Sequence, residues 1–177
     1  MKKLHLKSLF AVGCTLALLT AAGNAAGQEK AGAVATLTGT DGKGFGTVSF
    51  AEGPHGLLLE ADLENLPPGT LAFHLHATGA CSPDFKAAGG HLNPTNKKHG
   101  VLAAEGPHLG DMPNIHVPPS GKVQFELFLT DLNLDKGENQ LLDQDGTSVI
   151  IHKQPDDYKT DPAGGAGDRI ACGVIKK

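Results

Sequence analysis

Short segments with strand character recur along this chain from residue 32 onward, and turn signals separate them. Each segment combines short apolar runs with apolar–polar alternation, which is clearest at residues 123–129. Dipeptides such as Asp41-Gly42 and Asp145-Gly146 are typical of turns between strands. The segments are residues 33–40, 44–52, 56–66, 71–78, 122–132, 147–153 and 169–175. This rhythm predicts an all-β fold, a Greek-key β-sandwich or barrel of about eight antiparallel strands.

Two stretches interrupt the rhythm. Residues 79–120 carry little strand pattern, and residues 154–168 form a second, glycine-rich connection. Long irregular loops inside a compact domain usually carry function. The chain has 177 residues with 24 glycines, 11 prolines and no tryptophan, which suits one domain of short strands and many turns. We therefore expect a single β-domain at residues 28–177 with two long functional loops.

The first 27 residues differ in composition from the rest. A basic end with three lysines precedes an apolar run at residues 9–20 and a stretch of small residues. This pattern predicts a secretory signal peptide at residues 1–27 and export to the periplasm or the cell exterior. The run is shorter than the roughly 20 residues that cross a bilayer, so no transmembrane segment is expected. In an alternative interpretation, Cys14 is lipidated and anchors the mature chain to a membrane.

Loss of the leader changes the charge and the cysteine count. Removing Lys2, Lys3 and Lys7, with no acidic residue beside them, takes the formal charge from −4 by three units to −7. Without an excess of basic residues, binding to nucleic acid is not expected. Cys81 and Cys172 remain as a pair in an exported protein, which favours a disulfide between them.

Three histidines belong to strand segments. His74 and His76 are two residues apart on one predicted strand, so they face the same side about 7 Å apart at Cα, and both imidazoles can bind one ion. His152 ends the apolar segment 147–153. With one loop histidine, these three make an imidazole-rich set that suits Cu(II). The spacing leaves open which loop histidine joins them.

The first long loop carries a second set of candidate ligands. His91, His99, His108 and Asp111 follow one another at short intervals. Three imidazoles and one carboxylate make a closed tetrahedral set that suits Zn²⁺. The alternative is a polar surface loop that is merely rich in histidine.

Six motifs can then be considered together. They are FHLH (73–76), GGHLNP (89–94), KKHG (97–100), PHLGDMPN (107–114), IIHKQPDD (150–157) and GDRIACGVI (167–175). Their order and spacing resemble the copper/zinc superoxide dismutases over essentially the whole mature chain. The resemblance implies a β-sandwich enzyme with copper and zinc ions that converts two superoxide anions and two protons to dioxygen and hydrogen peroxide, and so protects the cell envelope. His55 and His116 fall outside the motifs and are expected at the surface.

The resemblance also assigns roles to individual residues. Asp156 would link copper-side and zinc-side histidines, and Arg169 would line the channel to copper, near the disulfide of Cys81 and Cys172. The copper ligands it implies are His74, His76, His91 and His152, and the zinc ligands are His91, His99, His108 and Asp111. His91 would therefore bridge the two metals and act with Arg169 in catalysis.

The chain departs from the family at two places near the strand that carries His74 and His76. Leu71-Ala72 stands where the family usually has His-Gly, and residues 77–80 replace a more acidic segment, but no ligand is lost. The rival functions are a copper carrier or zinc buffer on the same fold, and a purely structural or adhesive β-sandwich. The sequence leaves open whether the protein is a monomer or a homodimer.

Overall fold

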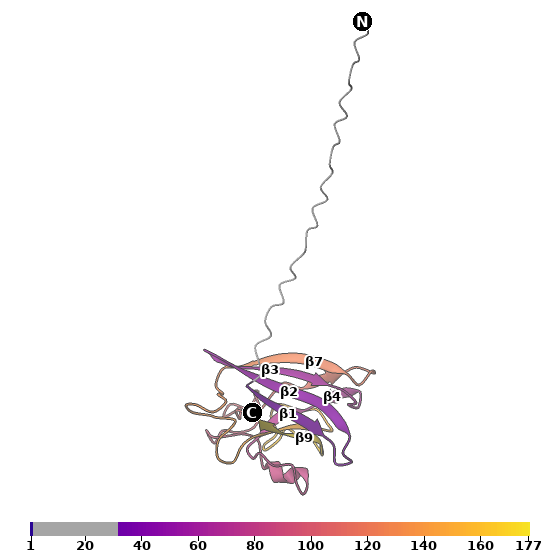
Figure 1. Ribbon diagram of the computed structural model, residues 1–177. Coiled ribbons are helices and arrows are strands. Elements are labelled where there is room, and N and C mark those ends of the chain that lie inside the picture. The colour runs from indigo at the N-terminus through magenta and orange to yellow at the C-terminus, as the bar shows by residue number, and fades with distance from the viewer. Residues whose placement is uncertain (2–31) are drawn as a thin grey trace.

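The computed structural model describes Met1 and residues 32–177, so Cys14 and the remainder of the predicted leader lie outside the described residues. Residues 32–177 form nine strands and one short 3₁₀ helix (Figure 1). Their bounds are β1 (Ala33–Thr38), β2 (Gly44–Gly53), β3 (Gly56–Leu63), β4 (Gly69–Leu71), β5 (Phe73–His76), η1 (Phe85–Ala88), β6 (Ile115–Val117), β7 (Val123–Leu129), β8 (Ser148–His152) and β9 (Arg169–Lys176). Within this part of the chain, no helix has the length and apolarity needed to cross a membrane.

Seven of the strands form one antiparallel sheet that curls as a half-barrel. Its order is β5-β8-β9-β1-β2-β3-β7, and Figure 1 shows β7, β3, β2, β1 and β9 side by side in that sequence. β4 and β6 form a second antiparallel sheet of two strands. Neighbours such as β3 and β7 are far apart in the chain, which is the mark of Greek-key connections. The predicted all-β fold is confirmed.

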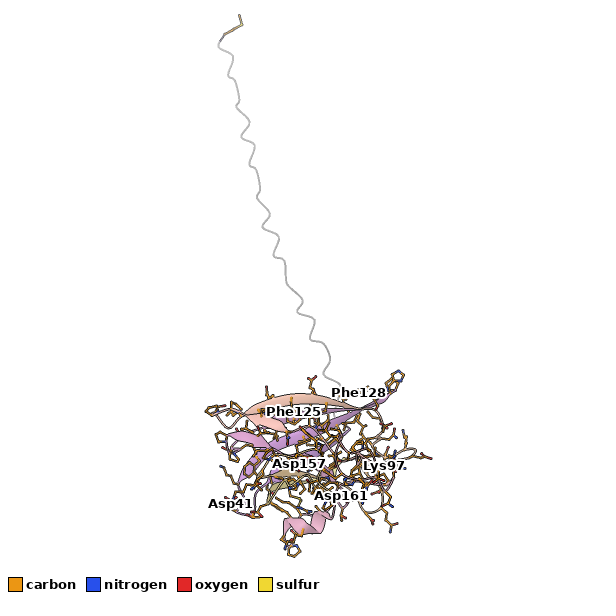
Figure 2. The ribbon with its side chains drawn as sticks, turned by 180° about the vertical axis from the view of Figure 1, so that it is seen from behind. Asp41, Lys97, Phe125, Phe128, Asp157 and Asp161 are labelled. Atoms are coloured by element: carbon orange, nitrogen blue, oxygen red, sulfur yellow. A yellow bond between two sulfur atoms is a disulfide. The ribbon has the colours of Figure 1, made fainter. Side chains whose placement is uncertain are left out.

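Alternation along the strands builds the core. In β1 every second residue is buried, and in β7 the side of Phe125 faces inward while Phe128 remains 60% exposed (Figure 2). The ring of Phe125 packs edge-on against Phe73, with the ring centroids 5.4 Å apart. Burial of a whole phenylalanine side chain, as at Phe73, stabilises the fold by about 1.5–3 kcal/mol. The largest fully buried apolar side chains are Phe50, Phe73, Leu37, Leu57, Leu59, Leu63, Leu75, Leu141, Ile150 and Ile151.

β5 and β8 are buried on both faces, and this places the candidate site. Phe73 and Leu75 of β5 point into the main core, so His74 and His76 point out of the barrel. These two histidines are nevertheless 0% and 1% exposed. The loops of residues 79–120 and 154–168 cover this outer face, since Gly89 of the first contacts His76 and Asp156 of the second contacts His74.

The strand predictions were correct for all seven segments, with two differences. Segment 71–78 is divided at Ala72, where the chain passes from the small sheet to the large one: the Ala72 N–H donates to Gln154 O and its carbonyl accepts from His152 N. Residues 79–120, which carry little strand pattern, contain one short strand, β6, whose three residues are too few to show alternation but suffice to pair with β4.

Candidate metal centre

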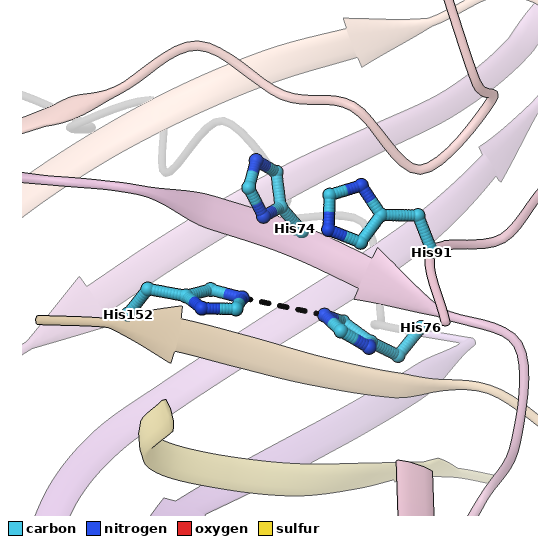
Figure 3. Close-up of side chains that lie close together, drawn as sticks. All are labelled: His74, His76, His91 and His152. Atoms are coloured by element: carbon cyan, nitrogen blue, oxygen red, sulfur yellow. Dashed lines mark hydrogen bonds between the residues drawn. The ribbon is translucent and has the colours of Figure 1, made fainter. Parts of the chain in front are cut away.

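Four histidines from β5, β8 and the first long loop meet on the outer face of the barrel. They are His74, His76, His91 and His152, and one ring nitrogen from each lies within 4.8 Å of the others. Figure 3 shows His76 and His152 facing each other, with their Nε2 atoms 3.4 Å apart. The strand register explains part of this arrangement, because β8 is the sheet neighbour of β5. Isolated bridges then join His76 to His91 and His74 to Asp111.

A second group of four lies beside the first. It consists of His91, His99, His108 and Asp111, whose ligand atoms also lie within 4.8 Å of one another. Oδ1 of Asp111 is 2.7 Å from His91 Nδ1, 3.0 Å from His99 Nδ1 and 3.2 Å from His108 Nδ1. Its other oxygen, Oδ2, accepts hydrogen bonds from the backbone N–H groups of Gly100 and His108. These bonds hold the carboxylate in one orientation at the centre of the group.

One loop histidine, His91, is common to the two groups. Its Nδ1 lies 2.7 Å from Asp111 Oδ1, and its ring lies 4.0–6.3 Å from the rings of the other three histidines of the first group, measured between centroids. Nε2 of His91 is buried and has no hydrogen-bond partner among the described residues, and the same holds for Nδ1 of His74. A buried polar atom without a partner is costly, so both atoms call for a ligand.

The hydrogen bonds of the first group leave one ring nitrogen of His74, His76 and His152 free to bind a cation. A neutral imidazole has one N–H and one lone pair. His74 Nε2 donates to Asp156, His76 Nδ1 donates to Gly89 O, and His152 Nδ1 faces Gly167 O at 3.3 Å. The remaining nitrogen of each ring therefore presents a lone pair to the other rings. Lone pairs that converge in a buried space repel one another unless a cation lies between them.

The second group meets the same test. Nε2 of His99 donates to Oδ1 of Asp156 at 2.9 Å, so its Nδ1 presents a lone pair toward the carboxylate of Asp111. Nδ1 of His108 also lies 3.5 Å from Nδ1 of His91. His91 and His108 can each donate an Nδ1 proton to Asp111, but His99 cannot, so a positive ion among these atoms makes its contact with Asp111 favourable. The residues therefore fit two ions, one in an all-imidazole site and one in a site of three imidazoles and a carboxylate.

The protonation states of these side chains favour metal binding at both groups. Burial is the largest effect on three of the histidines and lowers the pKa of His76 to about 2, of His152 to about 3 and of His91 to about 4. Burial by itself raises the pKa of Asp111, but its hydrogen bond from His91 and those from backbone N–H groups outweigh burial and lower it to about 2. Near neutral pH these imidazoles are uncharged and the carboxylate is ionised, so protons do not compete with a metal.

Asp156 connects the two groups directly. Its Oδ2 accepts from His74 Nε2 and its Oδ1 from His99 Nε2, both at 2.9 Å. Burial alone raises the pKa of this carboxyl, but the hydrogen bonds from the two histidines and from the Tyr158 N–H hold it well below its ordinary value. One ionised carboxylate therefore sets the ring orientation of a histidine in each group.

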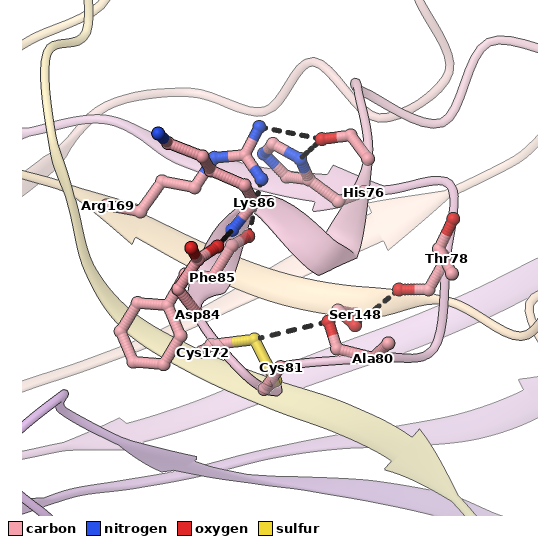
Figure 4. Close-up of a disulfide and its surroundings, with 11 residues drawn as sticks. His76, Thr78, Ala80, Cys81, Asp84, Phe85, Lys86, Ser148, Arg169 and Cys172 are labelled. Carbon is pink, nitrogen blue, oxygen red and sulfur yellow. Dashed lines mark hydrogen bonds between the residues drawn. A yellow bond between two sulfur atoms is a disulfide. The ribbon is translucent and has the colours of Figure 1, made fainter.

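Arg169 lies next to the all-imidazole group at the start of β9. Its guanidinium donates to Phe85 O at 2.5 Å and to Gly89 O at 2.6 Å, and Gly89 O also accepts from His76 Nδ1 at 3.0 Å (Figure 4). The loop that supplies these carbonyls is tied to β9 by the disulfide between Cys81 and Cys172. The predicted disulfide is confirmed. It fixes the distance between the loop and the strand that carries the arginine.

Comparisons with known proteins agree with this geometry. The family model described as copper/zinc superoxide dismutase (SODC) matches residues 45–175. The chain belongs to the copper/zinc superoxide dismutase family. Among the relatives of this dismutase chain, "Superoxide dismutase [Cu-Zn] 1" of Aquifex aeolicus is 48% identical over 80% of this chain and 86% of its own length. "Superoxide dismutase [Cu-Zn]" of Caulobacter vibrioides is 45% identical over 81% of this chain and 85% of its own.

Solved structures extend the agreement to the fold. A SOD-like protein from Bacillus subtilis has a TM-score of 0.76 at 39% identity and covers 80% of this chain and 96% of its own. The Cu/Zn superoxide dismutase from Brucella abortus has a TM-score of 0.65 at 33% identity and covers 81% of this chain and 98% of its own. The resemblance inferred from the six motifs is confirmed, and with it copper and zinc as the family's cofactors.

Sequence reasoning missed several contacts that hold this dismutase site together. His55 and His116 are exposed as expected, and His116 bonds only to Thr70. Gly89, however, was missed because its backbone carbonyl, and not a side chain, accepts the hydrogen bonds from His76 and Arg169. Asn114 bonds to the backbone of Asp156; the asparagine that closes the PHLGDMPN motif was the available signal.

Proposed function

We propose that this chain dismutates superoxide at the two groups of ligands described above. Copper would be held by His74 Nδ1 and by Nε2 of His76, His91 and His152, and zinc by Nδ1 of His91, His99 and His108 with Asp111 Oδ1. The observation that carries the proposal is the shared histidine: two four-donor sets, one purely imidazole and one with a carboxylate, meet at the two nitrogens of His91. Imidazole-rich sites suit Cu(II), and a closed set of three imidazoles and a carboxylate suits Zn²⁺.

Copper in the imidazole site supplies one-electron chemistry, by which one superoxide is oxidised to dioxygen and a second is reduced to hydrogen peroxide. The residues of the chain bind the superoxide anion, hold the metal-binding side chains in orientation and transfer protons. His91 Nε2 is the buried nitrogen best suited to carry a proton beside the substrate, because Nδ1 of the same ring is kept in place by the zinc-side group.

Arg169 is proposed to bind superoxide. Its guanidinium is held rigidly by two backbone carbonyls, so it offers a fixed positive charge without reorganisation. Burial lowers its pKa from the ordinary value, while the nearby Asp84 acts in the opposite direction, and an arginine remains charged. A mature chain with a formal charge of −7 repels an anion at long range, so the attraction must come from this local charge.

We also propose that the protein acts outside the cytoplasm and protects the cell envelope. The predicted leader, residues 1–27, and the Cys81–Cys172 disulfide support export. Mass spectrometry of the mature N-terminus distinguishes cleavage near residue 27 from lipidation at Cys14. Light scattering of the purified protein decides between the monomer and the homodimer.

Metal analysis combined with a dismutase assay tests the main proposal. The purified protein should contain copper and zinc in comparable amounts and should consume superoxide, with loss of activity when copper is removed and recovery when it is restored. Full metal content without activity would favour a copper carrier or zinc buffer. Replacement of His108 by Gln should lower the zinc content more than the copper content if the two sites are assigned correctly.

A further inference from the structure

Asp156 is held at its backbone as well as at its carboxylate. Asn114 uses its whole side-chain amide for this purpose: Oδ1 accepts from the Asp156 N–H at 2.8 Å, and Nδ2 donates to Asp156 O at 2.9 Å. Asn114 lies three residues after Asp111, the central carboxylate of the second group. The two-point bond therefore ties the loop of residues 154–168 to the loop that carries the zinc-side ligands.

Tyr158 completes this connection from the other side. Its N–H donates to Asp156 Oδ1 at 2.6 Å, and its phenol oxygen accepts from the Asn114 N–H at 2.9 Å. Its backbone has a φ of +64°, in the left-handed region that bulky side chains rarely adopt. Such a conformation persists only where surrounding contacts enforce it. Here the conformation lets one residue reach both Asp156 and Asn114.

The carbonyl of Tyr158 makes a third contact. It accepts from Leu102 N at 3.1 Å, and Gly100 packs so closely on it that a Cβ at Gly100 would lie 2.0 Å from the oxygen. The N–H of Gly100 donates to Oδ2 of Asp111. Tyr158 thus contacts the turn that orients Asp111, in addition to Asp156, which orients His74 and His99, and Asn114, which holds Asp156.

We propose that Tyr158 and Asn114 are positioning residues that hold Asp156, and through it the zinc-side and copper-side histidines, in metal-binding orientation. Asn114 acts through the backbone of Asp156, and Tyr158 acts through Asp156 and the turn at Gly100. The inference rests on the proposed function, since it assumes that the two groups bind copper and zinc. It assigns a role to Tyr158, which lies outside the six motifs, and to Asn114, to which the resemblance gave no role.

Tyr158→Phe tests the proposal with the least disturbance, because it removes only the phenol oxygen and leaves the Asn114 N–H without its acceptor. Metal-free protein is titrated with zinc against a chelator of known affinity, and Co²⁺ bound in the zinc site reports ligand geometry by its visible spectrum. We expect zinc affinity to fall about tenfold, as for other residues that orient ligands, and the cobalt bands to shift. Thr70→Val is the matched control: it removes an exposed side-chain hydrogen bond to His116, outside the metal groups, and should change neither readout.

A double-mutant cycle separates positioning from general loss of stability. If Tyr158 acts through Asn114, Tyr158→Phe should have little further effect on zinc affinity once Asn114→Ala is present, so the two effects are not additive. Additive effects, or a Tyr158→Phe variant with unchanged zinc affinity and an unchanged cobalt spectrum, would overturn the inference. Those outcomes leave the proposed function standing, whereas a wild-type protein that binds no zinc would remove the proposed function itself.

Discussion

Gly164 lies directly over the carboxylate that links the two metal groups. A Cβ built at this position would be 1.8 Å from Oδ1 of Asp156 and 2.7 Å from Nε2 of His99. The backbone there has a φ of +63°, which also disfavours any residue with a Cβ. Gly164→Ala should therefore push Asp156 away from His99.

The neighbouring Gly165 provides the matched control. Its φ is +65°, but a Cβ there would have no atom within 4 Å. Gly165→Ala should cost only the left-handed backbone, about 1–2 kcal/mol. Gly164→Ala carries the same backbone cost and must also break at least one hydrogen bond to the ionised Asp156, each contributing about 1.5–3 kcal/mol. The free energy of unfolding is therefore expected to fall by about 2.5–5 kcal/mol in Gly164→Ala.

Denaturant unfolding of both variants measures the difference, with slopes compared to establish that the native states are equally compact. Zinc retention against a chelator should fall for Gly164→Ala and remain near wild type for Gly165→Ala. Equal destabilisation of the two variants would refute the reasoning, because it would show that the contact with Asp156 contributes nothing beyond backbone conformation.

Three further predictions follow from the same structure. Arg169→Ala should lower kcat/KM for superoxide by about 10²-fold or more and weaken its dependence on ionic strength, with copper and zinc still bound; unchanged kinetics would contradict the assigned role. The metal-free protein should lose stability as pH falls from 7 toward 4. In the unfolded chain these imidazoles have a pKa near 6.5, whereas burial keeps His76, His91 and His152 neutral in the folded protein well below that pH. The unfolded chain therefore binds more protons as pH falls, and each histidine lowers the free energy of unfolding by about 1.4 kcal/mol per pH unit. Urea titrations at pH 7, 6 and 5 check this, and a flat profile would oppose it. Thr147→Val should be neutral or stabilising by about 1 kcal/mol, because the Thr147 hydroxyl is buried without a partner in the described structure; a clear loss in thermal unfolding would reveal a hidden partner.

The strands were predictable because their signals are local. Period-two alternation at residues 123–129 and the apolar run before His152 depend only on neighbouring residues. Both segments are strands, and in the first the alternating residues have the expected faces. β6 was missed for the complementary reason: three residues carry too little pattern, and their pairing partner β4 lies more than forty residues earlier. The break at Ala72 likewise depends on backbone bonds to residues 152 and 154, which no local pattern encodes.

The sequence by itself determined the chemistry of the site: the number of imidazoles, the carboxylate among them, the cysteine pair and the motifs that identify the family. Spacing along the chain could not decide which loop histidine serves both groups, because a flexible loop permits several pairings. The family resemblance implied that His91 is the shared residue, and the tertiary structure supplies the physical reason: the sheet places His152 beside β5, and the bridge from His91 to His76 brings the loop over them. The contacts of Asn114, Tyr158, Gly89 and Gly164 were equally beyond the sequence, because they arise from backbone groups of segments that meet only when the barrel has folded.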